Sequence, residues 1–247
     1  MSRCHHHPAA RWLQPFVDLL YPRSCAFCGE GVEGDVFPHL CDSCVGRVRW
    51  VRPPACATCG HPFFGEADED RVCPHCLFLR PAFGTGCTGV LVRGPVRALV
   101  HGLKYRGQIH LLRDMREILS RAEPLRAFLA GAVLVPVPLH PRKRRERGFN
   151  QSLLLAETLA GLSEATEVEE GLVKTADTES QTLFDREKRL RNLKNAFAIS
   201  PDFSLIRRKR YVLIDDVFTT GSTLNACARV LRRRGANRVD VATFGHG

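Results

Sequence analysis

The last two-thirds of the chain alternate apolar runs with stretches in which apolar residues recur at helical spacing. The apolar runs predict strands at residues 83–92, 132–137, 212–214 and 238–243. The helical spacing predicts helices at residues 95–105, 111–119, 150–162 and 222–234. Strands that alternate with helices indicate an α/β fold built on a parallel sheet.

Cysteine pairs dominate the segment before the sheet. Eight of the 11 cysteines form four Cys-x-x-Cys pairs between residues 25 and 76. One pair can grip an ion from a single turn, and tetrahedral zinc takes two such pairs, so we expect two structural zinc ions. The expected ligands are Cys25, Cys28, Cys41, Cys44, Cys56, Cys59, Cys73 and Cys76.

A repeat bears on which pairs share an ion. Cys-Ala-Phe-Cys-Gly at residues 25–29 recurs as Cys-Ala-Thr-Cys-Gly at residues 56–60, which favours two consecutive ribbons. An interleaved arrangement stays open, because the gaps of 12, 11 and 13 residues between pairs do not decide the matter. Redox-active pairs and an iron–sulfur cluster are the alternatives to zinc for such a set of cysteines. His39, His61 and His75 are not needed as ligands, and we expect them at the surface or as hydrogen-bond donors around the metal.

These patterns divide the chain into three parts. We expect an N-terminal helix or tail at residues 1–22, a double zinc ribbon at 23–80 and the α/β domain at 83–247. No run approaches 18 apolar residues, so no transmembrane helix is expected, and the first residues lack the apolar core of a signal peptide. We therefore expect a cytoplasmic protein, with peripheral attachment to the inner membrane left open.

Positive charge gathers in the α/β domain. The formal net charge is +10, and residues 101–247 hold 26 Lys and Arg against 17 Asp and Glu. The basic residues form runs at 142–147, 207–210 and 232–234. A basic run is most often only a solvated surface, but a polyanionic ligand, small or polymeric, is a serious alternative here.

Residues 211–223 combine a strand, an acidic pair, a turn and a helix start. They read Tyr-Val-Leu-Ile-Asp-Asp-Val-Phe-Thr-Thr-Gly-Ser-Thr. The turn offers backbone N–H groups, hydroxyls and a helix N-terminus to a phosphate, and Gly221 lets the backbone approach closely. Asp215 and Asp216 would repel a phosphate, so their natural partners are hydroxyls such as those of a ribose. The string therefore predicts a ribose 5-phosphate site, in preference to a solvated acidic turn before a capped helix.

A second group of polar residues is expected at the same end of the sheet. The strand at 132–137 leads into a proline-rich segment and the basic run 142–147, which we expect to be a rigid turn that directs cations toward a ligand. A polar flap over residues 175–190, without a strong period, is expected to contribute further contacts, with Gln181 and Asn192 among them. The predicted contacts to pyrophosphate or another polyanion are Lys104, Arg142, Lys143, Arg144, Arg145, Arg147, Lys174 and Arg189.

The string at 211–223 resembles the phosphoribosyl-pyrophosphate (PRPP) motif of type I phosphoribosyltransferases. By that resemblance Asp215 and Asp216 hold the ribose hydroxyls. The resemblance also implies that magnesium accompanies PRPP. The residues that it implies for the 5-phosphate are Thr219, Thr220, Gly221, Ser222 and Thr223.

Nearly the whole chain resembles the ComF family, which includes GntX-like proteins. The motifs are the paired Cys-x-x-Cys units, Gly-Leu-Lys-Tyr-Arg-Gly at 102–107, Val-Pro-Val-Pro at 135–138, Arg-Gly-Phe-Asn-Gln at 147–151, Arg-Leu-Arg-Asn-Leu at 189–193 and the string at 211–223. The family implies a double zinc ribbon, a phosphoribosyltransferase-like domain and a role in passing incoming single-stranded DNA into the cytoplasm during competence. Lys174 stands where an arginine is expected, which weakens the case for a bidentate contact there.

Two hypotheses for the function follow. The first is a DNA-handling protein of the competence and DNA-uptake type, which binds PRPP at the turn and single-stranded DNA on the basic surface, with a helicase or other uptake component as partner. The second is a phosphoribosyltransferase that transfers ribosyl phosphate from Mg-PRPP to an unknown base or amine. Enzymes that salvage 6-oxopurines carry an Asp where this chain has Thr219, which disfavours that acceptor. The sequence favours the first hypothesis, assigns no catalytic residue and leaves enzymatic activity undecided.

Overall fold

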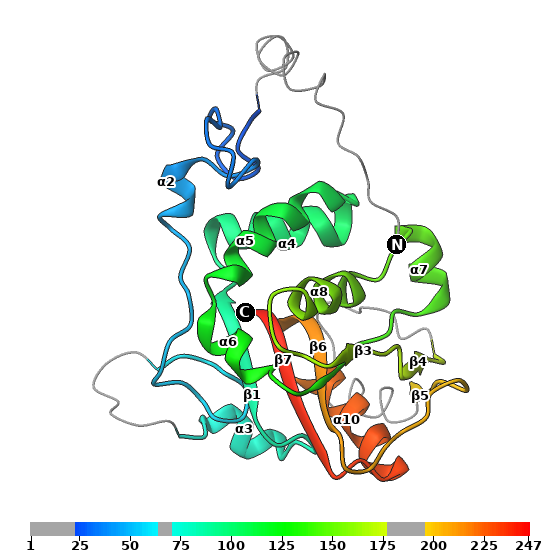
Figure 1. Cartoon of the computed structure of the whole chain (residues 1–247). Helices are drawn as coiled ribbons and strands as arrows, with labels where there is room; N and C mark the ends of the chain where they lie inside the picture. Colours follow the sequence, from blue (N-terminus) through cyan, green and yellow to red (C-terminus); the bar gives the residue numbers. More distant parts are fainter. Residues whose placement is uncertain (1–22, 64–70, 177–195) are drawn as a thin grey trace.

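Five parallel strands form the central sheet of the computed structural model, which describes residues 23–63, 71–176 and 196–247 (Figure 1). Their order is β1-β7-β6-β2-β3, and every neighbouring pair is parallel. A separate antiparallel pair joins β4 to β5. The strands are β1 (Gly86–Leu91), β2 (Val133–Pro136), β3 (Glu167–Val168), β4 (Leu172–Lys174), β5 (Phe197–Ile199), β6 (Arg210–Phe218) and β7 (Arg238–His246).

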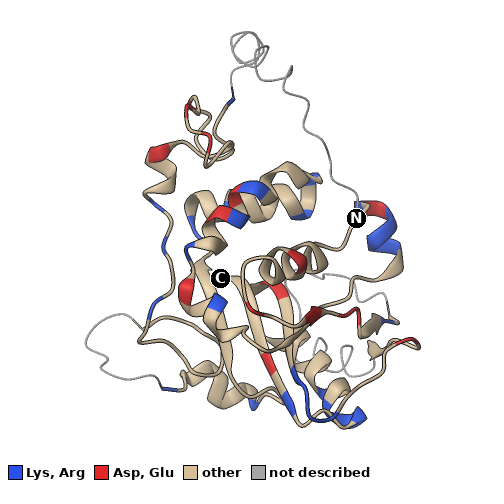
Figure 2. Cartoon of the chain, in the orientation of Figure 1, with Lys and Arg blue, Asp and Glu red and all other residues tan. Residues whose placement is uncertain are grey.

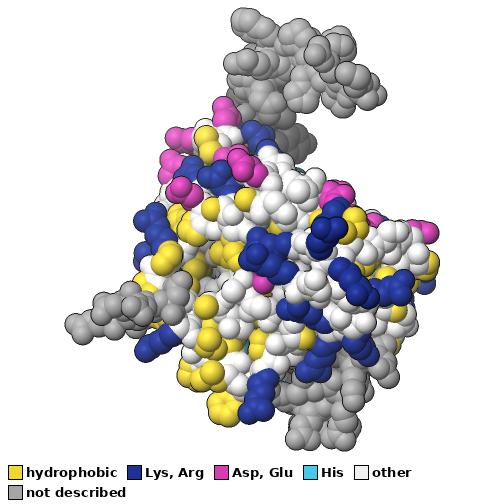
Figure 3. Space-filling model, turned by 60° about the horizontal axis from the view of Figure 1, so that its bottom comes forward, with side chains coloured by type: hydrophobic (Ala, Val, Ile, Leu, Met, Phe, Trp, Pro, Cys, Tyr) yellow, Lys and Arg dark blue, Asp and Glu magenta, His cyan; other side chains and the backbone are white. Residues whose placement is uncertain are grey.

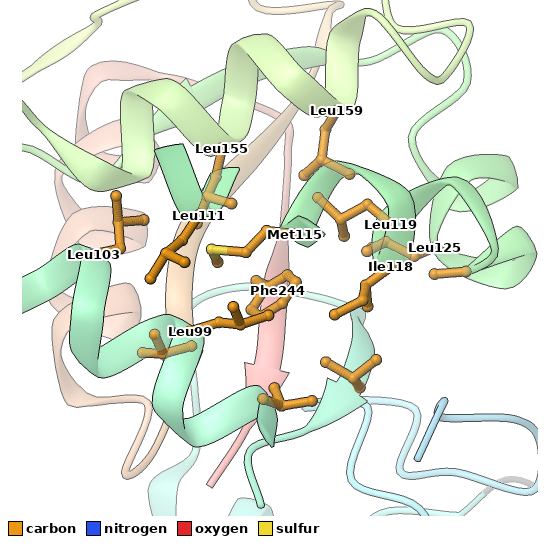
Figure 4. Close-up of a cluster of buried hydrophobic side chains, with 14 of the residues drawn as sticks. Leu99, Leu103, Leu111, Met115, Ile118, Leu119, Leu125, Leu155, Leu159 and Phe244 are labelled. Atoms are coloured by element: carbon orange, nitrogen blue, oxygen red, sulfur yellow. The ribbon is translucent and has the colours of Figure 1, made fainter. Parts of the chain in front are cut away.

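Helices pack on both faces of the sheet, so successive residues of a central strand are buried on opposite sides. In β6, Val212 and Ile214 join the hydrophobic cluster under α4, α5, α6 and α8, whereas Tyr211 and Leu213 join the cluster under α10. Figure 4 shows the first cluster, with Phe244 of β7 among the leucines of the helices. The helices are α4 (Gly94–Arg106), the 3₁₀ helix η1 (Ile109–Leu111), α5 (Leu112–Ser120), α6 (Glu123–Phe128), α7 (Pro141–Arg147), α8 (Gln151–Ala160) and α10 (Ser222–Arg234).

The predicted α/β fold with a parallel sheet is confirmed, but one predicted element is wrong. The basic run at 142–147 forms the helix α7 instead of a rigid turn. The helix has ordinary end signals, since Pro141 occupies its first turn, the His140 ring accepts a hydrogen bond from the Arg142 amide, and Gly148 ends it with a φ of 83°. Strands β3, β4 and β5 were not predicted, because strands of two or three residues are too short to show a period.

The cysteine-rich segment forms two small units on opposite faces of the sheet. The first unit contains α2 (Asp42–Val45) and packs with the cluster under α4 and α5; the second contains α3 (Pro74–Leu79) and packs with the cluster under α10 (Figure 1). Gly29 and Gly60 follow the first pair of each unit with φ of 82° and 71°, as a tight knuckle requires. The domain boundaries stay predictions, and the expected N-terminal helix or tail lies outside the described residues.

No helix within the described ranges combines the length and apolar character that crossing a bilayer requires.

Candidate functional site

The two carboxylates lie near the carboxyl end of β6, the central strand between β7 and β2. Asp215 is partly buried, and its Oδ1 accepts hydrogen bonds from the Ser152 hydroxyl at 3.0 Å and from the Asp216 amide at 2.9 Å. Ser152 belongs to the first turn of α8, so a helix on one face of the sheet fixes the orientation of the acid. Burial raises the pKa of Asp215 to about 7, and the negative charge of Asp216 adds to the rise.

Asp216 is more deeply buried and forms an ion pair with Lys104 of α4. The Lys104 Nζ lies 3.0 Å from Oδ2 and 3.3 Å from Oδ1, and only 5% of the Asp216 side chain is exposed. Burial opposes the charge on Lys104, but the carboxylates of Asp216 and Asp215 outweigh it and raise the pKa of the lysine. Lys104 thus neutralises part of the negative charge of the two acids.

The turn after β6 has the form of an anion cradle. Thr219 and Thr220 are exposed, Gly221 takes a left-handed φ of 67°, and α10 begins at Ser222. The Thr220 hydroxyl donates to Ser222 Oγ at 3.0 Å. The Ser222 amide donates to Thr220 Oγ1 at 3.4 Å. The next amides of the 13-residue helix α10 have no acceptors within the helix, so they and the positive end of its dipole are available to a phosphate.

The predicted polyanion contacts do not gather at one place. Arg147 joins Lys104 near the acids; burial lowers the pKa of its guanidinium, while the charge of Asp216 opposes that shift, and the guanidinium also donates to Gln151. Arg144 and Lys174 line a separate hollow of about 600 Å³ between α7 and the β4–β5 pair. Arg142, Lys143 and Arg145 lie on α7. Arg189, Gln181 and Asn192 lie outside the described residues.

Two arginines of α7 form ion pairs with carboxylates. Arg142 Nε lies 3.2 Å from Glu146 Oε1, and Arg144 Nη1 lies 3.2 Å from Glu170 Oε2. These exposed pairs reduce the positive field that α7 presents to a ligand, although each contributes little to stability.

A second basic surface lies at the opposite end of the sheet, where α10 ends and β6 begins. The runs at 207–210 and 232–234 meet there, because the Asn237 amide donates to the Arg207 carbonyl and Gly235 packs against the Arg207 guanidinium. Figure 2 shows the blue segments at the lower end of the molecule, and Figure 3 brings that end forward, with most Asp and Glu side chains near the upper rim of the view. Among the described residues, no carboxylate pairs with the exposed Arg207, Arg208, Arg232, Arg233 or Arg234.

The eight cysteines gather into two clusters of four thiols. Within each cluster the sulfur atoms lie within 4.8 Å of one another, and the members are consecutive pairs, in the sequential and not the interleaved arrangement. Three sulfur–sulfur distances are 3.5, 3.6 and 3.8 Å, close to the edge of about 3.8 Å in a tetrahedron with Zn–S bonds of 2.3 Å. The donor set therefore fits structural zinc.

Known protein families match both the cysteine-rich segment and the α/β domain. The family described as "Double zinc ribbon domain" matches residues 16–77, and the family described as "Phosphoribosyl transferase domain" matches residues 162–245. The DNA utilization protein YhgH of Escherichia coli K12 is 30% identical over 207 residues, which cover 82% of this chain and 88% of that protein.

The chain belongs to the ComF family. Competence protein F of Haemophilus influenzae is 27% identical over 206 residues, covering 82% of this chain and 88% of the relative. Competence protein ComFC of Bacillus subtilis is 27% identical over 218 residues, covering 83% of this chain and 82% of the relative. The resemblance inferred from the sequence motifs is confirmed, and this ComF protein combines two Cys4 sites consistent with zinc ribbons with a phosphoribosyltransferase domain.

Sequence reasoning missed one set of contacts in this ComF protein. His75 of the second ribbon contacts the Thr220 carbonyl at 3.1 Å, and the His61 ring lies 4.6 Å from the ring of His246 at the end of β7. His39 of the first ribbon instead pairs with the buried Asp114 of α5 at 2.7 Å. The only sequence signal was the position of each histidine between or beside metal ligands.

Proposed function

We propose that this ComF protein binds PRPP with magnesium at the turn after β6 and handles single-stranded DNA through its basic surface. The observation that carries the proposal is the adjacency of the Asp215–Asp216 pair to the N-terminus of α10. A sugar that carries both a diol and a phosphate ester needs acceptors for its hydroxyls close to backbone amides for its phosphate. The end of β6 supplies the acceptors and the start of α10 supplies the amides.

The cations near the acids suit the diphosphate end of PRPP. Lys104 is 29% exposed in its pair with Asp216, so it can turn toward the pyrophosphate when a ribose hydroxyl takes its place on the carboxylate. Arg147 adds a guanidinium that can bind phosphate oxygens in a bidentate manner. Oxygen ligands for magnesium would come from the pyrophosphate and from Asp215, whose ionisation the metal ion favours. Magnesium supplies charge neutralisation of the pyrophosphate.

The arginines at the far end of the sheet suit a nucleic-acid backbone. Arg233 and Arg234 project from the last turn of α10 without carboxylate partners among the described residues, whereas the Arg232 guanidinium donates to the backbone carbonyls of Ala82, Ala236 and Asn237. Cations placed there are stabilised by the helix dipole and are available to phosphates. The α7 arginines are less suitable, because Glu146 and Glu170 already pair with two of them.

The proposed setting is the cytoplasm, where eight ligand thiols stay reduced. A helicase or other uptake component is the proposed protein partner, and peripheral attachment to the inner membrane is compatible with that setting.

A second candidate is transfer of ribosyl phosphate to a base or amine. The match to a phosphoribosyl transferase domain favours it. The acceptor nitrogen would form a bond to C1 of the ribose as the bond from C1 to the pyrophosphate oxygen breaks, and the departing pyrophosphate would be stabilised by Lys104, Arg147 and magnesium.

Calorimetric titration with Mg-PRPP tests the main proposal. Wild-type protein should bind, and the Asp215→Ala, Asp216→Ala double variant should lose binding while retaining two zinc ions per chain. Absence of binding to zinc-replete wild-type protein would overturn the PRPP assignment. Pyrophosphate release with a panel of bases and amines separates the two candidates, since only the transferase requires it.

A further inference from the structure

We propose that the second Cys4 cluster holds the phosphate turn, residues 219–223, in its binding conformation through α3, so that zinc in this cluster and a phosphorylated sugar on the turn reinforce each other's binding. The inference rests on the proposed function of the turn. It assigns to the second ribbon a role that the first ribbon does not share.

The first contact is a hydrogen bond from α3 to the turn. His75 lies between the ligands Cys73 and Cys76, and its Nε2 is 3.1 Å from the Thr220 carbonyl oxygen. A carbonyl only accepts, so the ring must donate through Nε2–H. The partners are 145 residues apart in sequence, so this is a contact between the second ribbon and the α/β domain.

This hydrogen bond sets the direction of a neighbouring amide. The Thr220 C=O and the Gly221 N–H belong to one planar trans peptide, so they point in opposite directions. A carbonyl held toward the ribbon therefore turns the Gly221 N–H away from the ribbon. If His75 releases the carbonyl, the peptide plane can rotate and this donor direction is lost.

The second contact is the packing of α3 behind Gly221. A Cβ on Gly221 would lie 3.0 Å from Leu79 Cδ2 and 2.5 Å from Phe218 Cζ, so the space behind the turn is already filled. Leu79 ends α3, three residues after the ligand Cys76. The turn consequently rests on a helix whose own position depends on the cluster.

Further bonds fasten the second ribbon and the segment after it to α10 and to β1. After α3, the Ala82 amide donates to Asn225 Oδ1 of α10 at 2.8 Å, and Arg232 Nε donates to the Ala82 carbonyl at 3.2 Å. On β1, the Thr88 hydroxyl donates to the Cys59 carbonyl at 3.2 Å. Because the Asn225 amide in turn donates to the Gly221 carbonyl at 2.8 Å, loosening of the cluster is transmitted to the turn through α10.

The first ribbon provides the contrast. It is attached to α5, where His39 binds Asp114 and the Trp50 Nε1 donates to the Ile118 carbonyl at 3.0 Å. Neither of these contacts involves residues 219–223. A change in zinc at the first cluster should therefore leave sugar-phosphate binding nearly unchanged, provided that the chain stays folded.

Zinc release from wild-type protein tests the linkage without any variant. A chelator with a colorimetric zinc indicator should show two ions leaving, and saturating Mg-PRPP should slow release of one of them severalfold. The Cys28→Ser variant is expected to lose only the ion of the first cluster. The release rate of its remaining ion therefore identifies the ion of the second cluster in the wild type. If Mg-PRPP binds to the wild type but leaves both release rates unchanged, the linkage is wrong.

Substitution of His75 tests the contact itself. His75→Ala should retain both zinc ions and bind Mg-PRPP about fivefold to tenfold more weakly, the size of one lost hydrogen bond. His75→Gln, which keeps an N–H donor, should recover most of the affinity. Wild-type affinity in His75→Ala would overturn the role of this bond. Failure of the wild type to bind Mg-PRPP would overturn the proposed function, and this inference with it.

Discussion

Lys104 Nζ lies 3.0 Å from Asp216 Oδ2, which joins a helix on one face of the sheet to the carboxyl end of the central strand. The two residues are 112 positions apart in sequence. The acid is almost fully buried and the lysine is partly exposed, so the pair keeps a charge inside the protein while its cation can still reach a ligand.

Removal of the cation should destabilise the protein. We expect Lys104→Met to lower the free energy of unfolding by about 2 kcal/mol, because a buried carboxylate loses its partner. The loss is smaller than for a fully buried ion pair, because the lysine is partly solvated. Urea unfolding measures the change. Combining Lys104→Met with Asp216→Asn should restore most of the stability but not Mg-PRPP binding. A single variant as stable as the wild type would contradict the prediction.

Asp215 should make stability depend on pH. Its folded pKa of about 7 lies above its unfolded value, so the stability that it contributes is fully present below the unfolded pKa and is lost as pH rises to about 7. Asp215→Asn should therefore be more stable than the wild type at pH 8, by about 1–2 kcal/mol, and the difference should shrink toward pH 5.5. Thermal unfolding across this range measures it. A constant difference would show that Asp215 titrates normally.

Gly221→Ala should damage both stability and sugar-phosphate binding. The left-handed φ of 67° costs alanine about 1 kcal/mol, and the added methyl would meet Phe218 Cζ at 2.5 Å, so we expect a loss of about 2 kcal/mol or more. Gly131→Ala is the matched control, because Gly131 has a φ of 68° with nothing within 4 Å of the added carbon. Denaturant unfolding should show that Gly131→Ala lowers the free energy of unfolding by about 1 kcal/mol. Equal losses at the two positions would remove the packing argument.

Binding of single-stranded DNA should weaken steeply with salt. Replacing Arg233 and Arg234 by Gln should make the slope of log affinity against log salt shallower by about 1.4, because each phosphate contact on a single strand contributes about 0.7. Fluorescence anisotropy with a short oligonucleotide at several salt concentrations gives the slope. Arg142→Gln with Arg144→Gln is the control, and these paired arginines should change it less. The assignment fails if the α7 variant has the larger effect.

The strongest sequence signals were local. The strand β6 and the start of α10 contain the strand, the acidic pair and the turn in one short segment, and each Cys-x-x-Cys pair contains its two ligands within four residues. The sequence also carries local end signals for α7, since Pro141 suits the first turn of a helix and Gly148 suits its C-terminal end. The high density of positive charge in the run does not itself indicate a helix.

What could not be predicted depends on contacts between distant segments. Nothing in the sequence around His75 or Thr220 indicates the hydrogen bond between them, because the histidine ring could donate to any exposed backbone carbonyl. The placement of Arg144 and Lys174 in a hollow apart from the acids follows from the orientation of α7 and the β4–β5 pair, which sequence spacing does not specify.

The helix α10 begins at the glycine turn and ends in three arginines, and its 13 residues are about 20 Å long. That length is more than twice the distance over which dissolved salt attenuates charge under cellular conditions. A DNA strand bound at one end of the helix, as proposed, would thus be electrostatically screened from a phosphorylated sugar bound at the other. If ligand binding at one end of α10 is found to change the affinity at the other end, the coupling must come from a displacement of the helix and not from electrostatics.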